Sequence, residues 1–289
     1  MLLILPEQSG IIGFGECTYV IRRTDHMCVS ISSVKLPSAE MPYFSFGSGE
    51  NALVMLPGVF TKNLMTLSEA VKLAFSEFTK DYTFYVFERQ VPLSENCTIE
   101  QTAELTADAL DALGVENACV YGVSTGGMIA QSLAAKRGDL VRKLALISTA
   151  PYIEQDAAKA MGEIGELFKK GENETAAGMF GRLVYSRDFY EKYEKAIIDA
   201  VCGATNQEMQ RFIRLTGAIL RFDGRSALEK IKCPSVVVGG AQDMIFSQQI
   251  IKDTARIIGC PVMIYDGYGH AVYDELPQVK KDVFAFFSE

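Results

Sequence analysis

The sequence of 289 residues has few histidines, no closely paired cysteines and no long apolar run. Its seven cysteines are scattered without a C-x-x-C pair, which fits neither a zinc site nor a disulfide framework. No apolar run approaches the ~20 residues that a membrane-spanning helix needs. Basic residues number 28 against 36 acidic ones, and this balance does not suit a phosphate-binding surface. We therefore expect no metal, no nucleic-acid partner and no membrane partner.

Two further absences bear on location and architecture. Residues 1–6 form a short apolar run without a basic region before it, which predicts no signal peptide. Unpaired thiols are typical of the reducing cytoplasm, so a soluble cytoplasmic protein is expected. The sequence has no internal repeat, which excludes solenoids. It predicts no particular oligomeric state.

Short apolar runs alternate with helical patterns from about residue 31 onward. The runs are 52–56, 82–87, 118–121, 144–147, 235–238 and 262–265. Because they are apolar at nearly every position, we expect strands that are covered on both faces, as in a parallel sheet. Helices are expected at 99–113, at about 125–137 and from about 276. The alternation predicts an α/β fold with a mostly parallel central sheet flanked by helices.

One long stretch, residues 151–226, has helical patterns and no convincing strand. Two interpretations are open, namely a set of helices that completes the fold or a helical cap inserted between two strands. We favour the cap. The predicted division is an N-terminal extension of unclear structure at 1–30, a core at 31–150 and 227–289, and a cap at 151–226.

A G-x-S-x-G motif at residues 122–126 follows one predicted strand and opens a helix. A serine on such a sharp turn has a strained backbone, and its small neighbours let the helix pack closely. The turn exposes the Ser124 hydroxyl and aims the backbone N–H of Thr125 at an oxygen bound there. The alternative is an ordinary glycine-rich turn with a capping serine.

A serine hydroxyl needs a base to become a good nucleophile, and the chain has only two histidines to supply one. His270 lies on a glycine-containing loop just after the strand 262–265, where it can reach across the sheet edge. His26 lies between Asp25 and Met27 in the least readable segment, and we expect it at the surface. His270 is the predicted base.

The base in turn needs an acid that orients the imidazole. Asp243 directly follows the strand 235–238, which places it at the same sheet edge. Asp266, four residues before the histidine, is the main alternative, and Asp223 is a more distant one. We favour Asp243, because a carboxylate at position 266 would face solvent from a turn.

The order Ser124, Asp243, His270 is the nucleophile–acid–base order of α/β-hydrolases. Further segments match that fold, namely L-P-G-V-F at 56–60, G-A-Q-D at 240–243, G-H at 269–270 and D-E-L-P at 274–277. From about residue 31 to 289 the chain therefore resembles the α/β-hydrolase superfamily. The resemblance implies a catalytic triad of these three residues and a fold with an inserted cap.

The resemblance also implies an oxyanion hole made by the backbone N–H groups of Val59 and Thr125. Pro57 stands where the family often has histidine, although a backbone N–H can still donate after it. A second family pattern, D-x-R-G-x-G-x-S, is replaced here by F-E-R-Q-V-P-L-S at 87–94. Only Arg89 and Ser94 match it. We interpret Glu88 and Arg89 as structural or rim charges, with direct contact to substrate as the alternative.

The reaction that the resemblance implies is hydrolysis of a small ester or related acyl substrate through an acyl-enzyme, with no cofactor. A serine at the elbow argues against dehalogenation, for which the family uses aspartate there. A thioesterase, an aminopeptidase, a C–C bond hydrolase and a non-catalytic small-molecule binder stay open as alternatives. The Phe, Met and Tyr side chains of the cap either line an apolar pocket or only pack the cap helices together.

Overall fold

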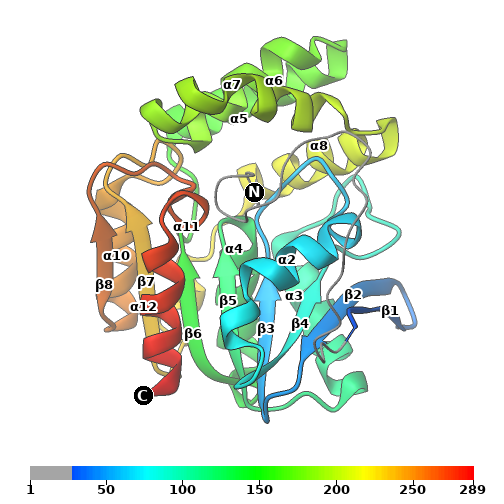
Figure 1. Cartoon of the computed structure of the whole chain (residues 1–289), viewed down its shortest axis with the longest axis vertical. Helices are drawn as coiled ribbons and strands as arrows, with labels where there is room; N and C mark the ends of the chain where they lie inside the picture. The colour runs from blue at the N-terminus through cyan, green and yellow to red at the C-terminus, as the bar shows by residue number, and fades with distance from the viewer. Residues whose placement is uncertain (1–27) are drawn as a thin grey trace, which may run out of the picture.

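The computed structural model describes residues 28–289, which form an eight-stranded sheet between layers of helices (Figure 1). The spatial order is β1-β2-β4-β3-β5-β6-β7-β8. The strands are β1 (Ser30–Lys35), β2 (Glu40–Gly47), β3 (Asn51–Leu56), β4 (Tyr82–Phe87), β5 (Ala118–Val123), β6 (Val141–Ile147), β7 (Ser235–Gly240) and β8 (Val262–Tyr265). All neighbours from β4 to β8 pair in parallel, and only β2 pairs antiparallel, with β1 and β4. The predicted fold class is confirmed.

The ends of the sheet differ from the expectation of strands covered on both faces. The hairpin of β1 and β2 adds an antiparallel edge, and its outer strand β1 is mostly exposed, with Val34 as its one buried residue. At the other end, β8 is an edge strand with only one neighbour, so its apolar residues are partly open and Val262 is 38% exposed. The central strand β5 is buried throughout, as the apolar pattern predicts.

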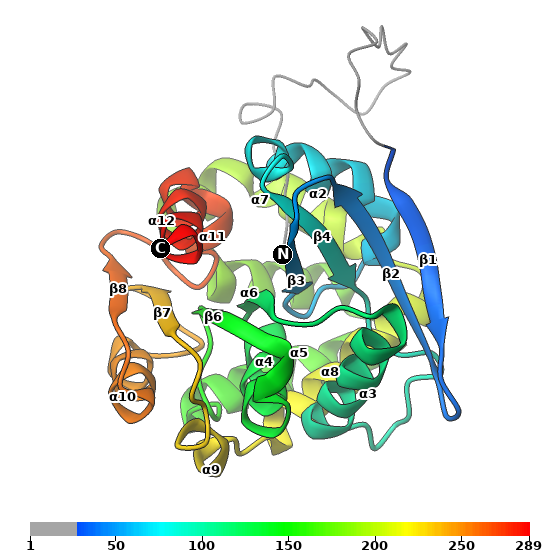
Figure 2. The same cartoon turned by 90° about the horizontal axis from the view of Figure 1, so that it is seen from below.

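Helices cover both faces of the sheet (Figure 2). The core helices are α2 (Ser68–Ala74), α3 (Ile99–Leu113), α4 (Thr125–Lys136), α9 (Arg225–Leu228), α10 (Gln248–Ile258), α11 (Val272–Glu275) and α12 (Pro277–Ser288), with short 3-10 turns η1 (Leu64–Leu67), η2 (Ser76–Phe78) and η3 (Gly138–Leu140). Helices α3, α4 and α10 pack one face, whereas α2 and α12 pack the other. The capping box predicted at Thr98 is present, and Gly114 ends α3 in the left-handed conformation.

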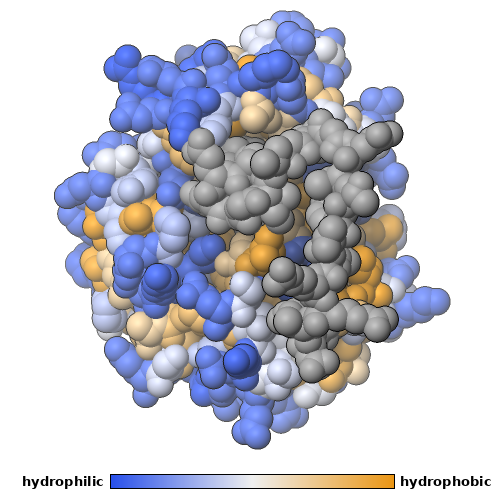
Figure 3. Space-filling model, in the orientation of Figure 1, coloured by the Kyte–Doolittle hydropathy of each residue, from blue (hydrophilic) through white to orange (hydrophobic). Residues whose placement is uncertain are grey.

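Of the five described helices between β6 and β7, the four that precede α9 lie above the carboxyl ends of the parallel strands (Figure 1). They are α5 (Gln155–Lys170), α6 (Asn173–Val184), α7 (Arg187–Cys202) and α8 (Asn206–Arg221), which we call the cap helices. Their outer surface at the top of Figure 3 is mostly hydrophilic, whereas their buried apolar side chains join the core cluster of the neighbouring sheet face. The residue bounds of the cap and core as domains stay a prediction.

Some sequence expectations concern residues outside the described part of the chain. His26 and most of the proposed extension at 1–30 lie there. Within residues 28–289, no helix is both long enough and apolar enough to cross a bilayer. The same residues contain no group of three or more His, Cys, Asp or Glu side chains that could hold a metal ion.

Candidate active site

Ser124 lies on the sharp turn between β5 and α4, at the carboxyl edge of the sheet and under the cap helices. Its backbone has φ +51° and ψ −119°, a conformation that side-chain-bearing residues rarely adopt. The Ser124 N–H donates to the Ile147 carbonyl of the adjacent β6 at 2.9 Å. This bond holds the turn against its neighbouring strand, and the strained serine predicted from the motif is present.

The motif glycines allow this turn because other backbone atoms lie where side chains would be. A Cβ on Gly126 would lie 1.9 Å from the Leu56 carbonyl oxygen, and a Cβ on Gly122 would lie 2.9 Å from the Gly127 Cα. Neither approach is possible for a larger residue without moving backbone. Helix α4 can therefore begin directly beside β3 and β5 only with glycine at these positions.

The structure brings the three residues expected to form a triad within hydrogen-bonding distance of each other. His270, on the loop after β8, has its Nε2 3.0 Å from the Ser124 Oγ. Its Nδ1 lies 2.9 Å from the Asp243 Oδ2, on the loop after β7. All three residues are buried, at 7% or less exposure. The result is a continuous chain from hydroxyl to imidazole to carboxylate.

Asp243 is held in place by backbone donors as well as by the histidine. Its Oδ1 accepts from the N–H groups of Ile245 and Phe246 at 2.8 and 2.9 Å. These bonds fix the direction of the carboxylate. The alternative acids do not compete, because Asp266 and Asp223 are both exposed and Asp223 pairs with Arg225.

The residues expected to form an oxyanion hole flank the serine. Gly58 lies so close that a Cβ there would be 3.2 Å from the Ser124 Cβ. Val59 follows it and lines a small cavity together with Ser124 and His270. Thr125 is the first residue of α4, where backbone N–H groups have no partner within the helix. Both residues therefore lie next to Ser124, and their role as oxyanion donors stays a prediction.

The cavity at Ser124 is small and closed by cap side chains. Its volume is about 20 Å³, and Met161, Phe180 and Ile219 of the cap line it. This is room for about one water molecule. A substrate must therefore displace side chains or the cap to reach the serine.

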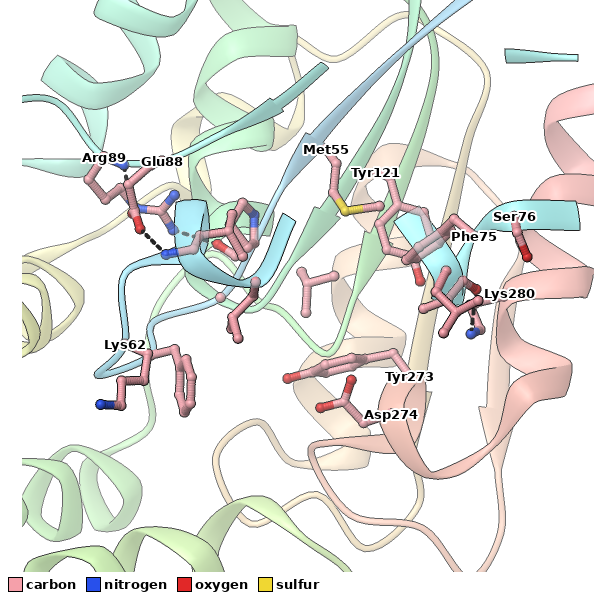
Figure 4. Close-up of a pocket in the computed structure, with 18 of the residues that line it drawn as sticks. Met55, Lys62, Phe75, Ser76, Glu88, Arg89, Tyr121, Tyr273, Asp274 and Lys280 are labelled. Atoms are coloured by element: carbon pink, nitrogen blue, oxygen red, sulfur yellow. Dashed lines mark hydrogen bonds between the residues drawn. The ribbon is translucent and has the colours of Figure 1, made fainter. Parts of the chain in front are cut away.

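A larger cavity of about 400 Å³ lies beside it, and the two share Gly58 and Tyr273 as lining residues. Ser124 and His270 are not among the described residues that line it. Figure 4 shows Glu88 and Arg89 at one end of this cavity, with Ser76 and Lys280 at the other. Most of the remaining wall is apolar or aromatic. The cavity has the size of a small-molecule site next to the cavity at Ser124.

Glu88 and Arg89 are buried, at 8% and 3% exposure, so they are not rim charges, and the burial supports a structural role, whereas direct contact with substrate stays a prediction. Burial lowers the pKa of Arg89 to about 10, which leaves the guanidinium charged at neutral pH. Its Nη2 donates to the Pro57 carbonyl at 2.5 Å. Both residues follow β4, and both also line the larger cavity.

Sequence reasoning missed several polar residues that support the site. The fully buried Thr149 donates its hydroxyl to the Ser124 carbonyl at 2.8 Å. Glu154, just before α5, accepts from the backbone and hydroxyl of Ser247, near Asp243. Thr149 could have been found from its position just beyond a buried strand. Glu154 has no such local signal, because only the fold brings it to Ser247.

The aromatic side chains of the cap pack mainly against each other. Phe168 and Phe180 each meet the Phe212 ring edge to face, with centroids 5.4 and 5.3 Å apart. Phe189 lies between Tyr185 and Tyr193. Of these aromatic residues, only Phe180 lines either of the two cavities. Their main role is therefore to hold the cap together.

A protein-family model described as "alpha/beta hydrolase fold" matches residues 74–277. This span is well over half of the chain and includes Ser124, Asp243 and His270.

Curated relatives match parts of the chain. A pimeloyl-[acyl-carrier protein] methyl ester esterase of Chromobacterium violaceum is 30% identical over 155 residues, which are 50% of this chain and 58% of that protein. A 3-oxoadipate enol-lactonase of Acinetobacter baylyi is 25% identical over 54% of this chain and 58% of its own length. In both cases the match spans less than two thirds of the relative.

Solved structures match at the level of the fold. An α/β-hydrolase enzyme from a Medee basin deep-sea metagenome library superposes with a TM-score of 0.79 and 20% identity, covering 89% of this chain and 98% of that one. The enol-lactonase of Burkholderia xenovorans superposes with a TM-score of 0.76 and 19% identity, covering 89% and 100%.

Proposed function

The chain belongs to the α/β-hydrolase family, and on that premise we propose that it is a serine hydrolase that cleaves carboxylic esters. The observation that carries the proposal is the hydrogen-bonded chain from Ser124 through His270 to Asp243. A protein that only binds a ligand has no need of all three groups in this geometry. Two relatives whose names specify a methyl ester and an enol-lactone support an ester as the bond that is cleaved.

In the proposed reaction, Ser124 Oγ attacks the ester carbonyl while His270 Nε2 takes its proton. Asp243 holds the imidazole with Nδ1 protonated and stabilises the imidazolium. The backbone N–H groups of Val59 and Thr125 donate to the tetrahedral oxyanion. His270 then protonates the departing alkoxide, and after the alcohol leaves it activates water to release the acid from Ser124. No step requires a cofactor.

We assign the larger cavity to the part of the substrate that does not react. It shares Gly58 and Tyr273 with the cavity at Ser124, so a group bound there lies beside that cavity, and its ester carbonyl reaches the hydroxyl once the cap side chains that close the cavity are displaced. Its largely apolar and aromatic wall, with Met55 and Phe75 among its residues, favours an apolar portion of the substrate. The proposal includes the cytoplasmic location predicted from the unpaired thiols.

The test combines an activity-based probe with a panel of esters. A fluorophosphonate should label the protein, and p-nitrophenyl esters of graded chain length should be hydrolysed. Ser124→Ala should abolish labelling and lower kcat by about 10⁴-fold or more, because the nucleophile is lost. The matched control is Ser94→Ala, which removes the exposed serine of the other family pattern and should leave both signals unchanged.

Three results would contradict the proposal. Labelling that persists in Ser124→Ala would place the reactive serine elsewhere. A wild-type protein that neither labels nor turns over esters would favour the non-catalytic binder. Labelling without hydrolysis of any ester in the panel would support Ser124 as the nucleophile but would contradict the proposal that esters are the substrate.

A further inference from the structure

The loop between β3 and α2, residues 57–67, carries Gly58 and Val59 and is held by side chains from two other elements. From the core, the buried Glu88 accepts from the Leu64 N–H at 2.9 Å through Oε2. Its Oε1 accepts from the Arg89 N–H at 2.8 Å, which fixes the carboxylate at the end of β4. Glu88 therefore ties the far end of the loop to the sheet.

From the cap, Arg211 of helix α8 reaches down to the same loop. Its Nη1 pairs with the Glu88 Oε2 at 2.5 Å. Its Nη2 donates to the carbonyl oxygens of Thr61 and Lys62 at 3.2 and 2.5 Å. One turn earlier on α8, Glu208 accepts from the Asn63 N–H at 2.6 Å. Helix α8 thus holds three consecutive residues of the loop.

The other end of the loop is held by Arg89. Its Nη2 donates to the Pro57 carbonyl, which belongs to the same rigid peptide unit as the Gly58 N–H. The next peptide unit carries the Val59 N–H. Glycine at 58 leaves that unit free to rotate unless the chain is fixed on both sides. Arg89 supplies the anchor before Gly58, and Arg211 with Glu88 supplies the anchor after Val59.

We propose that Arg211 is a positioning residue that keeps the Val59 N–H aimed at the oxyanion, so that the cap completes the oxyanion hole. This inference rests on the proposed serine-hydrolase function. Two observations support it, namely the cap side chains that close the cavity at Ser124 and the contact of α8 with the loop at 57–67. Whenever α8 moves away from the core, the loop loses its anchor at 61–63.

The same helix offers a matched control. Arg214, one turn after Arg211, also donates to a core carbonyl, that of Leu93 at 2.7 Å. It pairs with Glu95 and not with Glu88. Its contacts therefore join α8 to the core without touching residues 57–67.

The experiment compares Arg211→Lys with Arg214→Lys in the full chain. Lysine keeps the charge near Glu88 but cannot donate to Glu88 and two carbonyl groups at once with a planar fork. A lost oxyanion donor costs about 10²–10³-fold in kcat, so a misaligned one in Arg211→Lys should cost roughly 10-fold or more. Because Arg211 also lines the larger cavity, KM is compared with p-nitrophenyl acetate, whose acyl group is too short to fill that cavity, and it should stay within about twofold, since the donor acts on the transition state. Arg214→Lys should keep kcat within about twofold.

A second measurement separates positioning from general weakening of the fold. Phenylboronic acid forms a tetrahedral adduct with a reactive serine, and its affinity should fall in Arg211→Lys in parallel with kcat, but not in Arg214→Lys. Melting curves of the two variants give the structural comparison. If Arg211→Lys does not fold, Glu88→Gln serves in its place, because glutamine keeps one oxygen acceptor and removes the charge that pairs with Arg211.

Equal kcat and equal inhibitor affinity in the Arg211 and Arg214 variants, with wild-type turnover intact, would overturn the inference and leave the proposed function standing. A wild-type protein without labelling or turnover would instead reject the proposed function itself.

Discussion

At the scale of single residues, the conformation of Ser124 depends on the space that its neighbours leave. Ser124 is held at positive φ between a hydrogen bond to Ile147 on one side and helix α4 on the other. Such a conformation costs on the order of 1–3 kcal/mol and persists only where the surroundings enforce it. The glycines of the motif are part of that enforcement, because backbone from β3 occupies the position of a side chain at Gly126.

Gly126→Ala is therefore expected to disrupt the elbow. The added methyl would meet the Leu56 carbonyl oxygen, which belongs to a central strand and cannot rotate away. We expect a loss of about 3 kcal/mol or more in the free energy of unfolding, measured in urea, together with loss of fluorophosphonate labelling.

Gly162→Ala is the matched control, since Gly162 lies in α5 with open space around its Cα. It should raise the free energy of unfolding by about 0.5–1 kcal/mol, through better helix propensity. A Gly126→Ala protein as stable and as reactive as wild type would show that the close approach is not required.

At the scale of elements, polar contacts join the cap helices to the loops that carry the site. Ala271 donates its N–H to the Val184 carbonyl at the end of α6, next to His270. Ser186, between α6 and α7, donates its N–H at 2.9 Å and its hydroxyl to Glu275 of α11. Arg211 contacts the loop at 57–67, and Glu154 contacts Ser247 in the loop after β7. Together with the contacts of Ala271 and Glu275, they join the cap to the segments that carry Val59, Asp243 and His270.

The Glu275 anchor makes the stability of the protein depend on pH. Burial raises the pKa of Glu275 above its usual 4.5, against the lowering effect of the bonds from Ser186. A raised carboxyl pKa favours the protonated form in the folded protein. The contribution of this group is thus complete below pH 4.5 and decreases as the pH rises through the folded-state pKa.

Glu275→Gln should remove that dependence. The free energy of unfolding of the wild type minus that of the variant should fall between pH 4.5 and 7, in urea titrations at several pH values. Glu166→Gln is the control, because Lys169 lowers the pKa of Glu166. The free energy of unfolding of the wild type minus that of this variant should stay constant over the same pH window. A difference for Glu275→Gln that rises with pH would mean that the hydrogen bonds outweigh burial.

At the scale of the whole molecule, the sheet separates two apolar clusters, and each contains a buried thiol. Cys97 lies in the cluster shared by α3, α4 and the cap, and its Sγ is 3.8 Å from the Arg214 carbonyl oxygen. Cys119, on β5, lies in the cluster beneath α2 and α12. Burial raises the pKa of both thiols, which keeps them protonated and unreactive at neutral pH.

Alkylation of these thiols should report whether the two faces unfold together. At pH 8, we expect Cys97 and Cys119 to be alkylated at least about 10³-fold more slowly than the exposed Cys28. The rate at each cysteine is measured by mass spectrometry of the peptides. One continuous cluster joins the cap to one face of the sheet, and the same strands contribute residues to the cluster on the other face. We therefore expect both buried thiols to become reactive over the same range of urea. Modification of Cys97 at urea concentrations that still protect Cys119 would mean that the cap side opens by itself.

Much of this molecule can be predicted from local patterns. The apolar runs that became β3 to β7 are buried strands, because a continuous apolar segment must be covered on both faces. The motif around Ser124 and the positions of Asp243 and His270 after strands could be predicted for a similar reason, since parallel strands bring the residues after them to one edge. The strand at 262–265 was also predicted, and it is β8. The antiparallel pair β1 and β2 was less predictable, because neither strand has a continuous apolar run.

The sequence by itself determined the order of strands and helices, the nucleophile and the candidates for base and acid, all of which depend on local spacing. Only the tertiary structure decided that Asp243 and not Asp266 meets His270, and that Arg211 of the cap binds the loop beside Gly58. The physical reason is that a hydrogen bond between residues on different elements, 27 positions apart for Asp243 and His270 and 149 for Lys62 and Arg211, depends on how whole elements pack. No local propensity encodes that packing.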